Sequence, residues 1–344
     1  AANEESRISN EELVIVISMK TTSKFFIRNS SLAILALVVP LIAPSALAWG
    51  EKGHYLANEA ATIGLPTDMP HFFLRSFSEL RWLGYEPDRW RNAGESLEDA
   101  ASPDHFLDYE FAAGLDLPRS RYEFMALMEE SGRLRRFGIE NDTTGFLPWR
   151  VAELSELLTN QFRRWRFSEP DSIERSTLER EIIRTAGILG HYVADSANPH
   201  HATIHYNGWA SAENPLGFAI DCGTHSRFES VFVSHAVDLQ HVTPKLAEPV
   251  LRTDYFATAV DFIRESNALV RELYTLDRDG AFDIFRDDSR RGIAFASGRI
   301  AAGASLLRDI WWSAWRNSGQ SRSGRQTTSS APSLRFVNLA ATNR

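Results

Sequence analysis

The chain has 344 residues, a formal net charge of −8 and 43% hydrophobic residues, the composition of an ordinary globular protein. The acidic balance argues against non-specific attraction to nucleic acid or to an anionic membrane. It leaves a nuclease open, because bound cations supply positive charge that a count of side chains misses. Cys222 is the only cysteine, so no disulfide can form within the chain, and stability must come from the core or from bound metal.

The amino-terminal part carries the pattern of an export signal. Met19 and Lys20 are followed by an apolar run over 32–48 that ends in Ala46-Leu47-Ala48. The run is short and contains two prolines, which favours a cleaved signal peptide over a membrane anchor. We therefore predict a signal peptide over 19–48, a mature chain that begins at Trp49 without a transmembrane segment, and export to the periplasm or the cell exterior. Residues 1–18 are interpreted as an upstream or non-native segment.

The mature sequence predicts a single all-α domain over 49–317. Apolar residues recur at helical spacing in three stripes over 151–165, 178–193 and 256–273, and a long helix is expected over 289–315. Gly298, Ala302 and Gly303 would let that last helix pack closely. No sustained alternation typical of strands occurs. Residues 318–344 are poor in apolar side chains and predict a disordered tail.

Two loops are long for a compact helical domain, 84–104 and 201–224, and long loops of this kind are often functional. The second loop follows the strongest motif of the chain, which runs from Gly190 to His201. His191 and Asp195 are four residues apart and share one helix face, so they can hold one metal ion. The same spacing recurs at His225 and Glu229.

Two further clusters contain candidate ligands. One is the segment 102–108, which includes His105, and the other is the mature amino terminus, which includes His54. A single histidine is more often an ordinary residue than a ligand, but these clusters together indicate a metal centre. Imidazole and carboxylate without thiolate suit zinc in a hydrolytic site. We interpret His71, His200, His205, His235 and His241 as ordinary residues.

These motifs resemble the superfamily that joins bacterial zinc-dependent phospholipases C to fungal single-strand-specific zinc nucleases, and the resemblance covers nearly the whole mature chain. It implies an all-α enzyme with three zinc ions that hydrolyses phosphodiester bonds. It also implies that the free amino group and backbone oxygen of Trp49 bind zinc once the signal peptide is removed. The sequence departs from the family motif at Ala194 and Asn198, neither of which is a ligand position.

The resemblance also implies which residues hold each ion. One zinc would be held by Asp88, His105, His191 and Asp195, a second by His201, His225 and Glu229, and a third by Trp49, His54 and the other oxygen of Asp195. Asp88 would also orient the attacking water. Asp99, Asp104 and Asp108 remain alternatives to Asp88, because they too lie near His105 in the sequence.

The substrate stays open at this stage. The main hypothesis is a nuclease for single-stranded nucleic acid, in which Phe106, Tyr109, Tyr206 or Trp209 would stack on a base. The alternative is a phospholipase C acting on phospholipid head groups, although no sequence pattern identifies an apolar rim for lipid. A second alternative is a metal-stabilised binding protein without turnover. No stable protein partner is implied.

Overall fold

The structure is a computed structural model that describes residues 49–135, 144–286 and 289–320. The predicted signal peptide and nearly all of the predicted tail lie outside these residues. Within them, all regular structure is helical, and strand-type pairing is limited to one bridge between Tyr206 and Gly208. The prediction of an all-α fold is confirmed.

The helices are short around the long loops and long in the core. The amino-terminal elements are α1 (Gly50–Ile63), α2 (His71–Arg75), α3 (Phe77–Leu83), η1 (Pro87–Trp90), α4 (Glu95–Ala101), η2 (Ser102–His105), α5 (Tyr109–Ala112) and α6 (Arg121–Ser131). The central elements are α7 (Leu147–Phe167), α8 (Ile173–Ala197), η5 (Pro199–Ala202), α9 (Thr224–Ser226), η6 (Arg227–Phe232) and α10 (Val233–Ala236). The carboxy-terminal elements are α11 (Leu239–Val242), η7 (Thr243–Lys245), α12 (Tyr255–Ala268), α13 (Val270–Arg278) and α14 (Arg290–Ser318).

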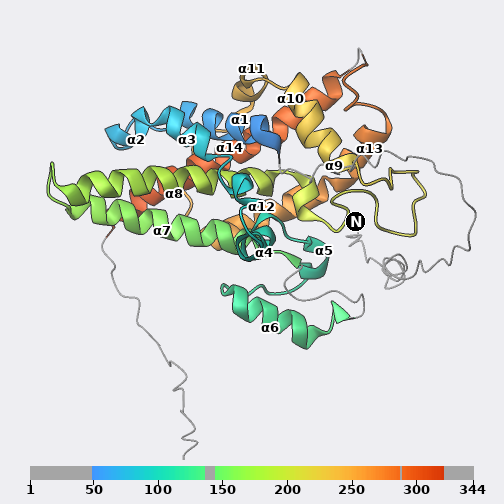
Figure 1. The fold of residues 1–344 in the computed structure, drawn as a ribbon, viewed down its shortest axis with the longest axis horizontal. Helices are drawn as coiled ribbons and strands as arrows, with labels where there is room; N and C mark the ends of the chain where they lie inside the picture. Colours follow the sequence, from blue (N-terminus) through green and yellow to red (C-terminus); the bar gives the residue numbers. More distant parts are fainter. Residues whose placement is uncertain (1–48, 136–143, 287–288, 321–344) are drawn as a thin grey trace, which may run out of the picture.

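The core lies between three long helices, α7, α8 and α14, with α1 and α3 covering one side (Figure 1). Two predicted stripes supply it: Leu158 and Phe162 of α7, and Ile182 and Leu189 of α8, are fully buried. Leu157 also lies within the range of the first stripe, but its side chain is 45% exposed. It lies next to Leu158 in the sequence, and adjacent residues of a helix point in different directions.

The third predicted stripe is divided between two helices. The backbone at Leu269 reaches φ −93° and ψ −1°, which ends α12 and starts α13. Residues of the stripe nevertheless stay in the core, because Phe256, Ile263 and Leu273 are all buried. The break changes the path of the chain and not the burial of the stripe.

The long carboxy-terminal helix α14 continues past the predicted end to Ser318, whose hydroxyl accepts a hydrogen bond from Arg166. Gly303 packs closely, because a Cβ placed there would lie 3.0 Å from the Cβ of Ala197 in α8. Gly298 was also expected to allow close helix packing, but a Cβ there would meet nothing within 4 Å. Gly298 therefore faces open space. None of the helices within the described ranges has the length and apolarity needed to cross a membrane.

Candidate metal centre

The centre is assembled on the last turns of α8, where glycines let two other helices approach. A Cβ on Gly190 would lie 2.0 Å from Oδ1 of Asn58, and a Cβ on Gly187 would lie 2.3 Å from the Cβ of Leu83. Asn58 is buried in α1 and donates hydrogen bonds to the carbonyls of Leu80 and Gly187. This packing brings α1 and α3 against α8 immediately before His191.

An inner group of five residues (His54, Asp88, His105, His191 and Asp195) results from this packing. The rings of His54 and His191 stack with centroids 3.9 Å apart. Nδ1 of His105 lies 3.0 Å from Oδ2 of Asp195 and 3.0 Å from Nε2 of His191. Within this group, two sets of three residues place potential ligand atoms close enough for one ion: His54, Asp88 and His191, and His105, His191 and Asp195.

Asp88 reaches the inner group from the short helix η1. Its carboxylate oxygens lie 3.9 Å from Nε2 of His54 and 3.9 Å from Nε2 of His191. The sequence alternatives are placed differently. Asp104 is ion-paired with Arg121 at 2.7 Å and Arg150 at 3.4 Å, and Asp99 is exposed. Asp108 belongs to none of the potential metal-binding sets among the described residues.

An outer group of three residues (His201, His225 and Glu229) forms beside the inner one. Nε2 of His225 lies 2.7 Å from Oε2 of Glu229 and 3.1 Å from Nε2 of His201. His201 comes from η5, which begins at the helix-ending Pro199, whereas His225 and Glu229 come from α9 and the π-helical segment η6. These three residues form one set that could hold a metal ion.

Asp195 lies between the two groups. Its Oδ2 faces His105 and His191, at 3.0 Å and 3.2 Å. Its Oδ1 lies 3.5 Å from Nε2 of His54 and 4.0 Å from Nδ1 of His201. One carboxylate thus presents its two oxygens to different sets of imidazoles, which is the arrangement of a bridging ligand.

Backbone carbonyls orient two of the imidazoles. Nδ1 of His191 donates to the carbonyl of Gly84 at 3.0 Å, and Nδ1 of His201 donates to the carbonyl of His105 at 2.7 Å. A proton held on Nδ1 leaves the lone pair of Nε2 directed into the centre, as metal-binding histidines require.

Burial and neighbouring charges shift the pKa values of the histidines and carboxylates of the centre. Burial lowers the pKa of His54, and together with the charge of Arg91 it lowers the pKa of His225 to about 3, so both imidazoles are neutral and able to bind metal. Burial raises the pKa of Glu229 to about 8. Burial opposes ionisation of Asp195 as well, but the neighbouring His191 and His201 hold the pKa of Asp195 well below its usual value.

Several polar atoms of the centre have no hydrogen-bond partner although they are buried. They include both ring nitrogens of His54, Oδ1 of Asp195 and Oε1 of Glu229. Buried polar groups are normally satisfied, and each exception calls for a physical reason. Divalent cations would satisfy these atoms and would also stabilise the ionised form of Glu229. The residues present therefore fit a metal centre.

The residues of the centre differ slightly in solvent exposure. The side chains of His54, Asp88, His191, Asp195 and Glu229 have no exposed surface, whereas those of His105, His201 and His225 are 5–7% exposed. A substrate would consequently approach past His105, His201 and His225.

Trp49 lies against both groups. Its indole Nε1 donates a hydrogen bond of 2.6 Å to the carbonyl of Ala194, next to Asp195, and its ring packs on Phe228. A Cβ on the following Gly50 would lie 3.5 Å from the backbone oxygen of Glu229. The residue expected at the mature amino terminus is thus fixed beside the metal groups.

Sequence reasoning missed two polar residues at the centre. Nη2 of Arg91 lies 3.0 Å from Oδ1 of Asp88, and its side chain is 24% exposed. Asn198 donates a hydrogen bond of 2.9 Å to Oε2 of Glu229. Arg91 follows Asp88 by three residues, a spacing that brings side chains together on one turn of helix. Asn198 lies inside the recognised motif, where it was interpreted as a departure at a position that is not a ligand.

Two of the aromatic residues proposed to stack on a base differ in their surroundings. Tyr206 is 55% exposed, and its ring lies 6.5 Å from that of His225. Trp209 stacks on His205 and packs against Phe218 and Tyr274. His200, interpreted as an ordinary residue, is buried behind the outer group with its ring 4.9 Å from that of His225.

Comparison with known proteins gives low similarity to solved structures. No protein-family model matches the chain, and no curated protein matches it. Among solved structures, it is similar to the alpha toxin from Clostridium absonum, with 14% identity, a TM-score of 0.40 and coverage of 78% of this chain. It is also similar to the Clostridium perfringens alpha-toxin isolated from avian strain SWCP, with 12% identity, a TM-score of 0.41 and coverage of 80%. The chain spans 66% of the length of each toxin.

Proposed function

We propose that this protein is a zinc-dependent phosphodiester hydrolase. The observation that carries the proposal is the pair of buried histidine–carboxylate groups joined by Asp195, with hydrogen-bonding atoms left unsatisfied. Imidazole and carboxylate ligands without thiolate favour zinc over Mg²⁺ or Ca²⁺, which prefer oxygen. Zinc bound there supplies an activated water at neutral pH and positive charge for the phosphate oxygens.

The residues of the chain have separate roles in this proposal. The inner and outer groups would hold the ions, with Asp195 placed between the two groups. His54 takes part through its unsatisfied Nε2, and the amino group of Trp49 completes the third site after cleavage before that residue. Asp88, on the floor of the site, orients the attacking water.

Arg91 is placed to bind the substrate phosphate. Its guanidinium is ion-paired with Asp88, and its charge contributes to the low pKa of His225. It is therefore close to both groups, and it is more exposed than any of the proposed ligands. A guanidinium binds phosphate oxygens through paired, charge-assisted hydrogen bonds.

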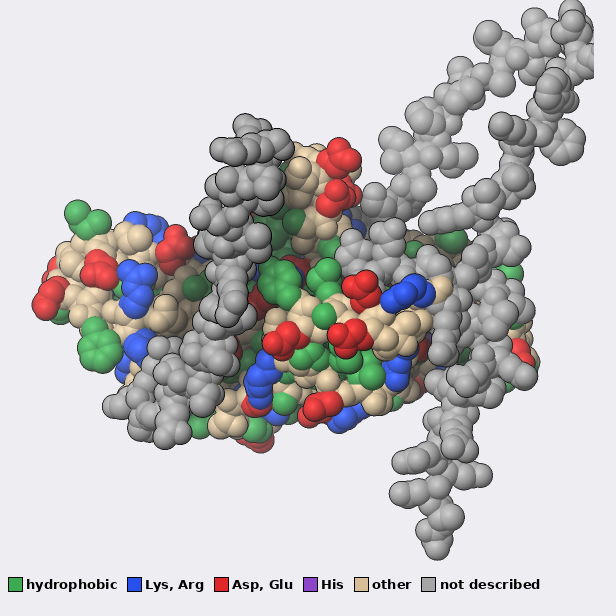
Figure 2. Space-filling model, turned by 90° about the horizontal axis from the view of Figure 1, so that it is seen from below, with side chains coloured by type: hydrophobic (Ala, Val, Ile, Leu, Met, Phe, Trp, Pro, Cys, Tyr) green, Lys and Arg blue, Asp and Glu red, His purple; other side chains and the backbone are tan. Residues whose placement is uncertain are grey.

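A phospholipid head group is the substrate that the surroundings of the site favour. The segment that joins His201 to His225 carries three exposed apolar or aromatic side chains: Tyr206 at 55%, Leu216 at 44% and Ile220 at 72%. These residues supply the apolar rim that the sequence pattern did not identify. Acidic and basic side chains are interspersed on the part of the face in Figure 2 that grey atoms do not cover.

Single-stranded nucleic acid is the second candidate, because the exposed ring of Tyr206 beside His225 could stack on a base. For both substrates, the proposal includes export of the protein and cleavage before Trp49. The cleavage creates the free amino group that would bind the third ion.

A paired assay tests the proposal. Zinc-loaded protein beginning at Trp49 is given phosphatidylcholine vesicles and, separately, single-stranded DNA. We expect release of phosphocholine, with no release by an Asp195→Asn variant. Cleavage of DNA without release of phosphocholine would replace the lipid substrate with nucleic acid. Hydrolysis of neither substrate by protein with a full complement of zinc would contradict the proposed activity.

A further inference from the structure

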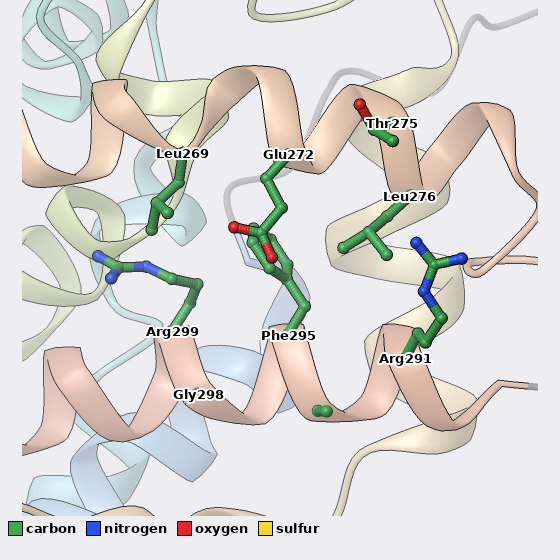
Figure 3. A pocket seen from close by; sticks show the side chains of 9 residues that line it. Leu269, Glu272, Thr275, Leu276, Arg291, Phe295, Gly298 and Arg299 are labelled. Atoms are coloured by element: carbon green, nitrogen blue, oxygen red, sulfur yellow. The ribbon is translucent and has the colours of Figure 1, made fainter.

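A groove of about 560 Å³ lies between α13 and α14 (Figure 3). It is lined by Leu269, Glu272, Thr275, Leu276, Arg291, Ala294, Phe295, Gly298 and Arg299. Its volume falls in the range of small-molecule sites. No residue of the inner or outer group lines it, so what it binds is independent of the metal chemistry proposed above.

Arg299 is a partly buried cation at one end of the groove. Its Nε donates to the carbonyl of Ala197, and its Nη2 donates to Oγ of Ser266, both at 2.8 Å. Both partners are neutral. Within the described ranges, no carboxylate lies at ion-pair distance from Arg299, and Glu265 and Glu272 act on it only from further away. Burial lowers the pKa of Arg299 to about 10, so the side chain keeps its charge at neutral pH.

The other charged side chains of the groove are arranged differently. Arg291 is ion-paired with Asp279 at 3.4 Å. The side chain of Glu272 extends from α13 towards Phe295 in the middle of the groove (Figure 3). Removing a cation from water is costly without a counter-ion. Among the described residues, Arg299 is the cation of this lining with no carboxylate at ion-pair distance, although its guanidinium also lies over the ring of Phe262. An anion is therefore favoured at the Arg299 end, and Glu272 disfavours a second negative charge.

Between the two arginines the lining is apolar apart from Glu272 and Thr275. Leu269, Leu276 and Phe295 line this stretch (Figure 3). Gly298 contributes no side chain, and a Cβ there would meet nothing within 4 Å, so the space above it is open. The groove thus joins one cation without a carboxylate partner to an elongated, largely apolar surface.

We propose that the groove between α13 and α14 binds an amphiphile with a single carboxylate, of the long-chain fatty acid type. The carboxylate accepts hydrogen bonds from Arg299, and the chain lies over Gly298 and Phe295 towards Leu276. The charge and the chain are each required for tight binding, because the first offsets the partly buried cation and the second covers the apolar lining.

Titration of the zinc-loaded protein with a dansyl-labelled long-chain fatty acid tests the site. Decanoate should displace the probe, and decanol, which has the same chain without charge, should need roughly tenfold higher concentration because a charge-assisted hydrogen bond is lost. Acetate should not displace it. Equal competition by decanoate and decanol would overturn the assignment of the anion to Arg299.

Two variants locate the site. Gly298→Leu fills the groove without a clash and should abolish displaceable binding, whereas Ala257→Leu, which adds the same side chain to an exposed position of α12, should not change it. Arg299→Gln should make decanoate and decanol equal competitors while leaving decanol unchanged, a result that mere loosening of the fold would not give. Binding by Gly298→Leu as tight as that of the unchanged protein would reject the groove as the site.

Discussion

The inner and outer groups are built by different parts of the fold. Helices α1 and α8 carry most residues of the inner group, and the contact between Gly190 and Asn58 fixes the distance between these helices. The outer group stands on short segments around the long loop, and its carboxylate is held by the side chain of Asn198. Helix packing therefore positions most of the inner group, whereas the outer group depends more on side-chain hydrogen bonds.

The largest effect is expected at the residue shared by both groups. Asp195→Asn keeps the shape but removes the bridging charge, so kcat/KM for the phosphodiester should fall on the order of a thousandfold, as when a preorganised charged group is lost. Bound zinc, measured by elemental analysis, should fall with it. Asp309→Asn is the control, because Asp309 is a buried aspartate paired with Arg252 and Arg308 away from the centre. That variant should lose stability and keep its zinc.

Removal of one outer ligand should show whether the two groups bind metal independently. His225→Ala should release the ion of the outer group and leave those of the inner group, with activity falling by roughly a hundredfold or more. Zinc content and kcat/KM of the same preparation provide the measurement. Release of all the ions by this one substitution would show that the inner group does not hold metal independently.

A smaller loss of metal affinity or activity is expected when a ligand is kept but the hydrogen bond that holds it is removed. Asn198→Ala leaves Glu229 in place without its hydrogen bond, and loss of such an outer partner typically costs about 10–100-fold in metal affinity or activity. The affinity of the last zinc ion, measured by competition with a chelator, should weaken. Asn317→Ala is the control, since Asn317 donates to Arg252 and Tyr255 away from the centre. It should leave the affinity unchanged.

The packing that holds the inner group can be tested through stability. Gly190→Ala places a methyl group against Asn58 and should destabilise the fold by about 2 kcal/mol, a typical cost of overpacking. Gly298→Ala, also in a helix but facing open space, should instead stabilise it by up to about 1 kcal/mol. Chemical denaturation measures both. Equal effects of the two substitutions would contradict the role given to Gly190.

The smallest effect concerns the apolar rim beside the outer group. Ile220→Ser should lower the rate on phospholipid vesicles roughly fivefold, because partial burial of one isoleucine in lipid contributes about 1 kcal/mol. The rate on a soluble short-chain phosphodiester should stay the same. Ile173→Ser removes another highly exposed isoleucine, at the opposite end of α8, and should change neither rate. Equal losses for the two variants would argue against a specific lipid contact.

The sequence alone determined those features whose geometry is local. His191 with Asp195 and His225 with Glu229 are each four residues apart, and one turn of helix brings such pairs together whatever surrounds them. The helical stripes of α7 and α8 follow from the same periodicity, and so does the all-α fold class.

Tertiary structure alone decided how these pairs meet. His54 stacks on His191 because Asn58 fills the space beside Gly190, and no local pattern encodes that contact. Asp88 and Asp104 are the same residue type near the same histidine, but Arg121 and Arg150 bind one of them and the other points into the centre. The physical reason is that the backbone fixes distances within a turn, whereas contacts between distant segments depend on which side chains fill the space between helices.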